Sequence, residues 1–214
     1  MLRIPFINGL SEKSESEISK EIENSGALIN IDKVNWPDEF PDNRETRVYC
    51  AHDGINIVLL FKCTGMHLKA VVDEDLGPVA SDSCVEFFVQ PDPSSPRYWN
   101  FEFNAIGRKN VSTRIVRSEP RRLSKEELAQ IKTFPSVGRE TFDEKFGLHE
   151  WSLLTTIPLE LINVHFDGKP IEMHGNFYKC GGKTSSPHYL SWHPIKTDEP
   201  DFHRLEFFGK ITLG

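Results

Sequence analysis

Residues 98–105, YWNFEFNA, alternate polar and apolar side chains more strictly than any other part of the chain. The odd-numbered positions are all apolar: Trp99, Phe101, Phe103 and Ala105. The even-numbered positions all carry a polar group: Tyr98, Asn100, Glu102 and Asn104. Because successive side chains of a strand point to opposite faces, this segment predicts a β-strand with one face in a core and the other pointing away from it.

The same period of two recurs in short segments from Glu45 onward, separated by turn-forming residues such as Asp53-Gly54 and Gly181-Gly182. The predicted strands are residues 45–51, 55–63, 67–72, 85–89, 111–117, 150–157, 176–180 and 205–213. In the second of them one face is apolar: Ile55, Ile57, Leu59, Phe61 and Cys63. About nine short strands spaced in this way predict an all-β chain, a two-sheet antiparallel β-sandwich with one or two short helices.

Two segments have helical character. Residues 11–23 are polar except for Ile18 and Ile22, and they indicate a short surface helix or an ill-ordered leader. Residues 124–132, SKEELAQIK, begin with the capping-box pair Ser124 and Glu127 and carry an apolar stripe. No linker divides the chain, so we expect a single domain over residues 1–214, with 1–33 as a leader and 34–214 as the core.

The composition and charge of the chain argue against several classes of binding partner. The 214 residues include 15 phenylalanines, enough apolar side chain to form a core without metal or disulfide help. The net charge of -7 and the lack of basic clusters argue against nucleic-acid partners. No apolar run reaches the roughly 18 residues of a membrane span, so no membrane partner is expected. The N-terminus lacks a secretory signal as written, which predicts a cytoplasmic protein if Met1 is the native start, and a secreted or periplasmic one if a signal was removed.

Four cysteines are scattered without metal-ligand spacing: Cys50, Cys63, Cys84 and Cys180. We expect each to behave as a small buried hydrophobic residue, and the sequence leaves open whether any of them pair as disulfides. The eight histidines form no HExxH or comparable pattern, so metal binding also stays open.

The polar face of the predicted strands is the first candidate site. Glu86 and Gln90 share a face on one strand, and Tyr98, Asn100, Glu102 and Asn104 share a face on another. Acids, amides and a phenol can bind sugar hydroxyls, each of which donates and accepts. The alternative is an ordinary solvated sheet face. If Glu86 and Glu102 are neighbours, they could also form the carboxylate pair of a retaining glycosidase. The alternation shows only which face of its strand each glutamate occupies, and not whether the two strands are adjacent.

The C-terminal run 188–209 is the second candidate, because it gathers aromatic and histidine side chains among prolines. Trp192 is the best stacking platform for the apolar face of a sugar, unless it and Phe202 plug the end of the sandwich. Trp99 and Trp151 are expected in the core, and Trp36 could lie in either environment.

Three runs carry a resemblance: DSCVEFFVQ (82–90), YWNFEFNAIG (98–107), and NFYKC (176–180) followed by residues 188–209. Together with VNWPDEFP near Trp36, they resemble the carbohydrate-binding module family 9-like domains of the DOMON-like superfamily, relatives of which are often labelled endo-1,4-beta-xylanase by similarity. The resemblance implies a β-sandwich that binds a terminal sugar between two tryptophans, often with calcium, on domains attached to xylanases. Asp82, Glu86 and Asn104 match the family motif, but residues 78–81, PVAS, lack the tryptophan that often precedes it.

The leading hypothesis is a non-catalytic domain that binds an oligosaccharide or polysaccharide, with sugars of plant origin as the expected ligand. Trp192 is assigned as the stacking platform. The hydrogen-bonding candidates are Glu86, Tyr98, Glu102, Asn104, Asn176, Tyr178 and His193. No cofactor is required, although the resemblance implies calcium. Two alternatives remain: a glycoside hydrolase that uses Glu86 and Glu102, and a structural or interaction sandwich that has lost the sugar site.

Overall fold

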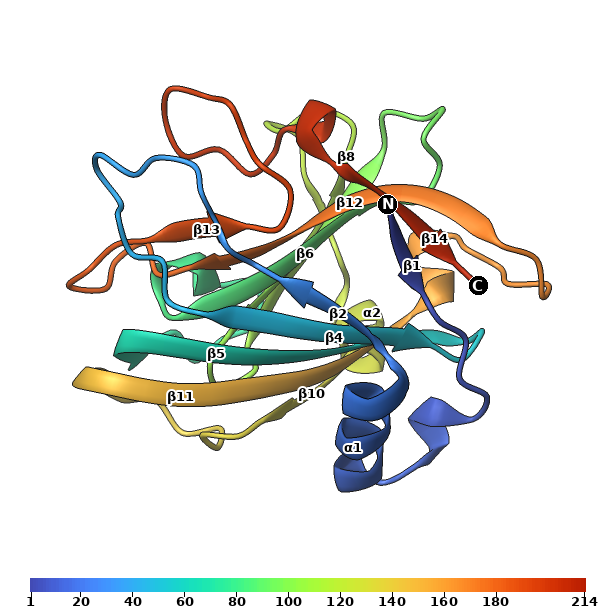
Figure 1. The fold of residues 1–214 in the computed structure, drawn as a ribbon, viewed down its shortest axis with the longest axis horizontal. Coiled ribbons are helices and arrows are strands. Elements are labelled where there is room, and N and C mark those ends of the chain that lie inside the picture. Colours follow the sequence, from blue (N-terminus) through green and yellow to red (C-terminus); the bar gives the residue numbers. More distant parts are fainter.

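Fourteen strands form two packed β-sheets in the computed structural model, which describes residues 1–214 (Figure 1). Sheet A has the order β1 (Leu2–Ile4), β14 (Gly209–Leu213), β12 (Ile171–Cys180), β6 (Cys84–Gln90), β7 (Tyr98–Asn104), β8 (Lys109–Arg114) and β9 (Arg121–Arg122), with β13 (Tyr189–Ser191) beside β12 and β3 (Lys33–Val34) beside β13. Sheet B has the order β10 (Lys132–Pro135), β11 (Phe142–Pro158), β5 (Asn56–Ala70), β4 (Thr46–His52) and β2 (Ala27–Asn30). The predicted β-sandwich is therefore confirmed.

The space between the sheets holds the main hydrophobic core. Trp99, Phe101 and Phe103 of β7 all face it and are almost fully buried, as their alternation predicts. Phe87 of β6 and Phe177 of β12 stack there with ring centroids 4.7 Å apart. One expected core residue lies elsewhere: Ile55 is 67% exposed, because it belongs to the turn that precedes β5.

A second hydrophobic layer covers the opposite face of sheet A, which the alternation predicts to be polar. It combines side chains of β6, β7 and β12 with residues of the C-terminal segment 195–208 and of the segment around Trp36. The rings of Tyr178 and Phe202 stack with centroids 4.0 Å apart and planes within 6°. The polar residues of β7 are consequently buried, and the interpretation of this face as a solvated surface is wrong.

Helix α1 (Glu15–Ser25) lies outside the two sheets, whereas α2 (Lys125–Gln130) contributes Leu128 to the main core. Helix α1 places Ile18 and Ile22 against the outer face of sheet B, where they pack with Leu60 (Figure 1). Helix α2 begins at the predicted capping box. Four short 3-10 helices complete the elements: η1 (Leu10–Glu12), η2 (Val79–Ser81), η3 (Leu159–Ile162) and η4 (Leu205–Phe207). None of the helices is long and apolar enough to cross a membrane.

Residues 1–33 contribute short strands to both sheets. Strand β1 pairs in parallel with β14, and β2 pairs with β4. Such short strands show no period of their own, and their partners lie far along the chain. The predicted strands 55–63 and 67–72 likewise form one strand, β5, because β11 pairs with it on both sides of Gly65. The predicted strand 205–213 begins instead with η4, and only β14 is extended.

We predict that Phe177→Ala lowers the free energy of unfolding by about 3–5 kcal/mol, because it leaves a cavity beside Phe87 in the main core. Chemical denaturation followed by tryptophan fluorescence measures the change. Phe146→Ala is the matched control, since Phe146 is 68% exposed and its loss should change stability by less than about 0.5 kcal/mol. Equal effects of the two substitutions would contradict this assignment of the core.

Candidate functional site

Two glutamates stand side by side on the covered face of sheet A. The register of β6 and β7 places Glu86 directly opposite Glu102, an adjacency that the sequence pattern left open. Both side chains border a small cavity of about 160 Å³ between the sheet and the segment 200–203. The other bordering residues are Ala80, Phe88, Arg117, Cys180, Tyr189, Pro200, Asp201, Phe202 and His203. A pair of acids and several rings thus meet in one place.

Amide groups hold Glu102 in position. Asn100 Nδ2 donates to Oε1 at 2.8 Å, and Asn110 Nδ2 donates to Oε2 at 3.0 Å. The Asn100 side chain is itself fixed, because its oxygen accepts from Ser112 at 2.7 Å and from Arg114 at 3.0 Å. Burial raises the pKa of Glu102, whereas the two amides and the nearby Arg114 act to lower this pKa.

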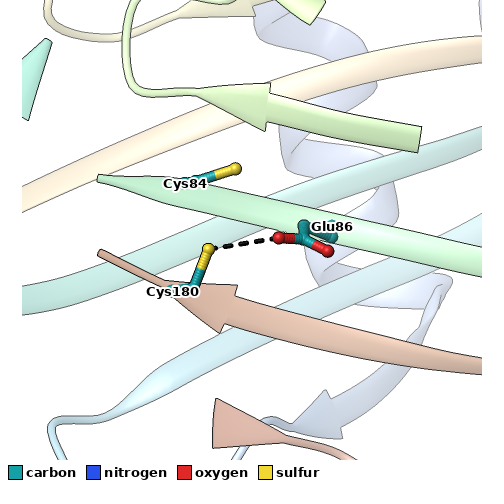
Figure 2. A group of neighbouring side chains, drawn as sticks. All are labelled: Cys84, Glu86 and Cys180. Carbon is teal, nitrogen blue, oxygen red and sulfur yellow. Dashed lines mark hydrogen bonds between the residues drawn. The ribbon is translucent and has the colours of Figure 1, made fainter. Parts of the chain in front are cut away.

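Glu86 has a different environment. Its side chain is buried, and Cys180 Sγ donates to Oε1 at 3.1 Å (Figure 2). Burial, followed by the neighbouring Cys180 and Glu102, raises the pKa of Glu86 well above its usual value. The protonated form of Glu86 is therefore favoured in the folded protein, and a carboxylic acid can both donate and accept a hydrogen bond.

The segment 200–203 closes the cavity and is tied to the sheet. Tyr98 Oη and His203 Nδ1 form a hydrogen bond of 3.0 Å. Burial, together with Arg114 and Arg117, lowers the pKa of His203 to about 3, so this histidine is neutral at pH 7. Arg117 pairs with Asp201 at 3.3 Å at the edge of the cavity.

Four of the predicted hydrogen-bonding residues bond to the protein itself. Tyr98 contacts His203 as above, and Tyr178 Oη donates to the Phe202 carbonyl at 3.1 Å. Asn176 Nδ2 donates to the His193 carbonyl at 2.9 Å, and its oxygen accepts from the His193 amide at 2.9 Å. Asn104 lies at the far end of β7, where its amide donates to the Val72 carbonyl and to Asp82 at 3.0 Å each. These side chains anchor loops to sheet A.

Trp192 and His193 do not border the cavity. The Trp192 ring is half-buried and meets Phe177 edge-on, with centroids 5.9 Å apart, and a Cβ at Gly209 would lie 2.8 Å from this ring. The indole thus packs against the main core, in an environment unlike that of a stacking platform beside Glu102. The rings at the cavity are Phe88, Tyr189 and Phe202.

Sequence reasoning missed Arg117, Tyr189, Asp201 and His203 as residues of this cavity. Three of them lie in the aromatic run 188–209, which the sequence analysis names as the second candidate site. The sequence analysis preferred Trp192 to Phe202 as the stacking platform. In the structure the chain turns after β13 and directs Trp192 toward the main core. Phe202 instead stacks on Tyr178, on the face of sheet A that borders the cavity. Trp36 is buried in the same layer, with Nε1 donating to the Thr197 carbonyl at 2.7 Å.

The acidic side chains form no cluster of three that would suit calcium, and the calcium that the resemblance implies stays a prediction. Asp82 keeps one buried oxygen without a partner, but the Asn104 amide occupies the space between its other oxygen and the Val72 carbonyl. The only group of three acidic, histidine or cysteine side chains contains two thiols, Cys84 and Cys180, together with Glu86. Calcium prefers ligands that are all oxygen.

We predict that Glu86→Gln changes the pH dependence of stability. Because the pKa of Glu86 is raised on folding, the wild type loses stability as the pH rises above about 4.5, by up to about 1.4 kcal/mol per pH unit, until the raised pKa is passed. The variant lacks this loss, so its stability relative to the wild type should increase with pH. Urea denaturation from pH 4 to pH 8 measures how the free energy of unfolding of each protein changes with pH.

Glu172→Gln, at an exposed position of β12, is the control and should leave the pH dependence of the wild type unchanged. Parallel profiles for Glu86→Gln and the wild type would refute a buried, protonated Glu86.

Comparison with known proteins supports one family. The family model of Carbohydrate-binding family 9 matches residues 19–213. A Bacteroides uniformis protein described as carbohydrate-binding is 36% identical in sequence, with a TM-score of 0.91 over 100% of this chain and 98% of that one. Comparison with curated proteins gave no match.

Two further structures share the fold at low sequence identity. Both are family 9 carbohydrate-binding modules of Caldicellulosiruptor kristjanssonii, one in complex with glucose and the other with cellotriose. Each has a TM-score of 0.63 and covers 99% of this chain, at 10% and 11% identity, and the alignments cover 95% and 92% of those chains. Since the family match extends over nearly the whole chain and the Bacteroides structure agrees with it, the chain belongs to carbohydrate-binding family 9.

Proposed function

We propose that this chain binds carbohydrate without catalysis, by taking one terminal sugar ring into the cavity between Glu86, Glu102 and Phe202. The observation that carries the proposal is the pair of buried carboxyl groups facing a cavity that aromatic rings also border. Carboxyl groups bind sugar hydroxyls, and rings pack against the C–H face of a sugar. At about 160 Å³ the cavity is smaller than the roughly 300 Å³ at which pockets for drug-sized ligands begin, which favours one ring over a chain.

The two carboxyl groups have complementary roles in this proposal. Glu102 already accepts from two amides and offers its remaining lone pairs to a hydroxyl donor. Glu86, which burial favours in the protonated form, can donate to a hydroxyl oxygen or accept from its hydrogen. A neighbouring pair of sugar hydroxyls, each able to donate and accept, fits this arrangement.

The family relationship supports glucose-type sugars as the first ligands to test. The two Caldicellulosiruptor modules of the same fold were obtained with glucose and cellotriose. Xylan-derived sugars and other plant oligosaccharides extend the same proposal, since xylose differs from glucose only in lacking the hydroxymethyl group. Attachment to a glycoside hydrolase and a bacterial source are part of this proposal as well.

A glycosidase is the second candidate function, and a specific observation favours it. Glu86 and Glu102 are directly opposed on neighbouring strands, and their environments differ: the amides and Arg114 favour an ionised Glu102, whereas Glu86 has no such partners. A retaining glycosidase uses one protonated and one ionised carboxyl group about 5 Å apart. Hydrolysis also needs room for a glycosidic bond and the sugar rings on both sides of it. The small cavity supports a bound terminus instead.

We predict that isothermal titration calorimetry detects binding of glucose, cellotriose or xylotriose, and that Glu102→Gln weakens it at least about tenfold, or about 1.4 kcal/mol. The amide replaces an ionic acceptor and places a donor near Asn100 or Asn110. The control is Glu150→Gln, at an exposed position away from this cavity, which should bind as the wild type does. A flat response of the wild type across the panel, or unchanged affinity in Glu102→Gln, would contradict the proposal.

We predict no sugar release when the wild type is incubated with cellotriose, xylotriose or their nitrophenyl glycosides. Chromatography of the products measures this directly. Hydrolysis that Glu86→Gln and Glu102→Gln each abolish, in folded protein, would establish the glycosidase instead. Hydrolysis that survives both substitutions would exclude these roles and indicate a contaminating enzyme.

A further inference from the structure

Two cysteines face each other on neighbouring strands beneath the cavity. The register of β6 and β12 places Cys84 directly opposite Cys180, and both thiols are free and almost fully buried. Side chains of directly opposed residues in an antiparallel pair begin about 4.5–5.5 Å apart at Cβ. The sugar proposal uses neither sulfur as a ligand. Both thiols are therefore available for another ligand.

A carboxyl group completes the cluster. Glu86 lies two residues after Cys84, so both side chains project from the same face of β6. One oxygen of Glu86 and the two sulfurs all lie within 4.8 Å of one another, converging from β6 and β12 (Figure 2). Ligand atoms around a tetrahedral zinc ion are about 3.5–3.8 Å apart, given Zn–S bonds of about 2.3 Å and Zn–O bonds of about 2.1 Å. The 3.1 Å between Cys180 Sγ and Glu86 Oε1 and the 4.8 Å upper limit for the three atoms bracket this spacing.

The ligand types select the metal. Two thiolates and one carboxylate suit zinc and other thiophilic ions, whereas calcium and magnesium prefer oxygen ligands throughout. We propose that Cys84, Cys180 and Glu86 form a three-ligand site for a thiophilic divalent ion, with zinc as the natural occupant. Cys180 and Glu86 also border the cavity, which gives the ion a route to the site and allows water to complete its coordination.

The cluster differs from the other buried cysteines of the chain. Cys50 and Cys63 lie in the main core between the sheets, and neither belongs to a group of three potential ligands. Burial raises the pKa of Cys84 to about 12, so without metal this thiol keeps its proton. A bound zinc ion would replace the protons of both thiols and of Glu86. It would also join the start of β6 to the end of β12.

Cobalt(II) titration of the reduced, metal-free protein tests the site, because cobalt–thiolate coordination gives a near-ultraviolet charge-transfer band. We expect one cobalt ion per chain, with the band removed by one equivalent of zinc. Cys84→Ala and Cys180→Ala should each abolish the band, and Glu86→Gln should weaken cobalt binding at least about tenfold. The matched control is Cys50→Ala, which removes an equally buried free thiol and should leave the band intact.

Absence of a thiolate band in the wild type would overturn the proposal, as would a band that persists in both Cys84→Ala and Cys180→Ala. Circular dichroism establishes that each variant is folded, and Glu86→Gln provides an independent ligand test if either alanine variant fails to fold. The metal site shares Glu86, but no other ligand, with the proposed sugar site. Calorimetry on metal-free protein tests sugar binding, so failure of one proposal is distinguishable from failure of the other.

Discussion

The site depends on the packing of segment 195–208 over the outer face of sheet A. A sandwich needs apolar faces only between its sheets, yet here Phe88, Tyr98 and Tyr178 build a second apolar layer on the far side. The Tyr178–Phe202 stack anchors that layer, and the tyrosine hydroxyl holds the Phe202 carbonyl at the same point. Without this cover, Glu86 and Glu102 would lie on a wet sheet surface. With it, both carboxyl groups are buried beside a small cavity.

Burial is what gives the two carboxyl groups their chemistry. An ionised group removed from water loses solvation that only hydrogen bonds or opposite charge can replace. Glu102 has two amide donors and a nearby arginine, whereas Glu86 has one weak thiol donor. Burial raises the pKa of both carboxyl groups, but the amides and Arg114 partly offset this rise at Glu102, whereas the pKa of Glu86 is raised well above its usual value. One pair of identical residues thus provides both an acceptor and a donor within one cavity.

The sequence pattern predicted well which face of a strand each side chain occupies, but it did not predict which residues of other strands lie beside it. Alternation correctly directed Trp99, Phe101 and Phe103 into the core and Glu102 to the other face, because side-chain direction in a strand is a local property. Strand order and register depend on contacts between distant segments, so the pairing of Glu86 with Glu102, and of Cys84 with Cys180, was not readable. Nor could local pattern distinguish Trp192, which packs on the core, from Phe202, which covers the cavity.

The stretch 78–81, which departs from the family pattern, borders the cavity without contributing an aromatic ring. Family resemblance implies a tryptophan just before Asp82, but Ala80 borders the cavity from this stretch and provides no ring. The aromatic contacts come instead from Tyr189 and Phe202, in the C-terminal run. In the proposed sugar site, residues 78–81 would offer no ring to stack on the sugar, so the carboxyl pair would supply a larger share of the binding energy. Since hydrogen bonds depend on hydroxyl geometry and stacking mainly on ring shape, we infer that the proposed site would discriminate sugars by hydroxyl configuration more than a two-tryptophan clamp would.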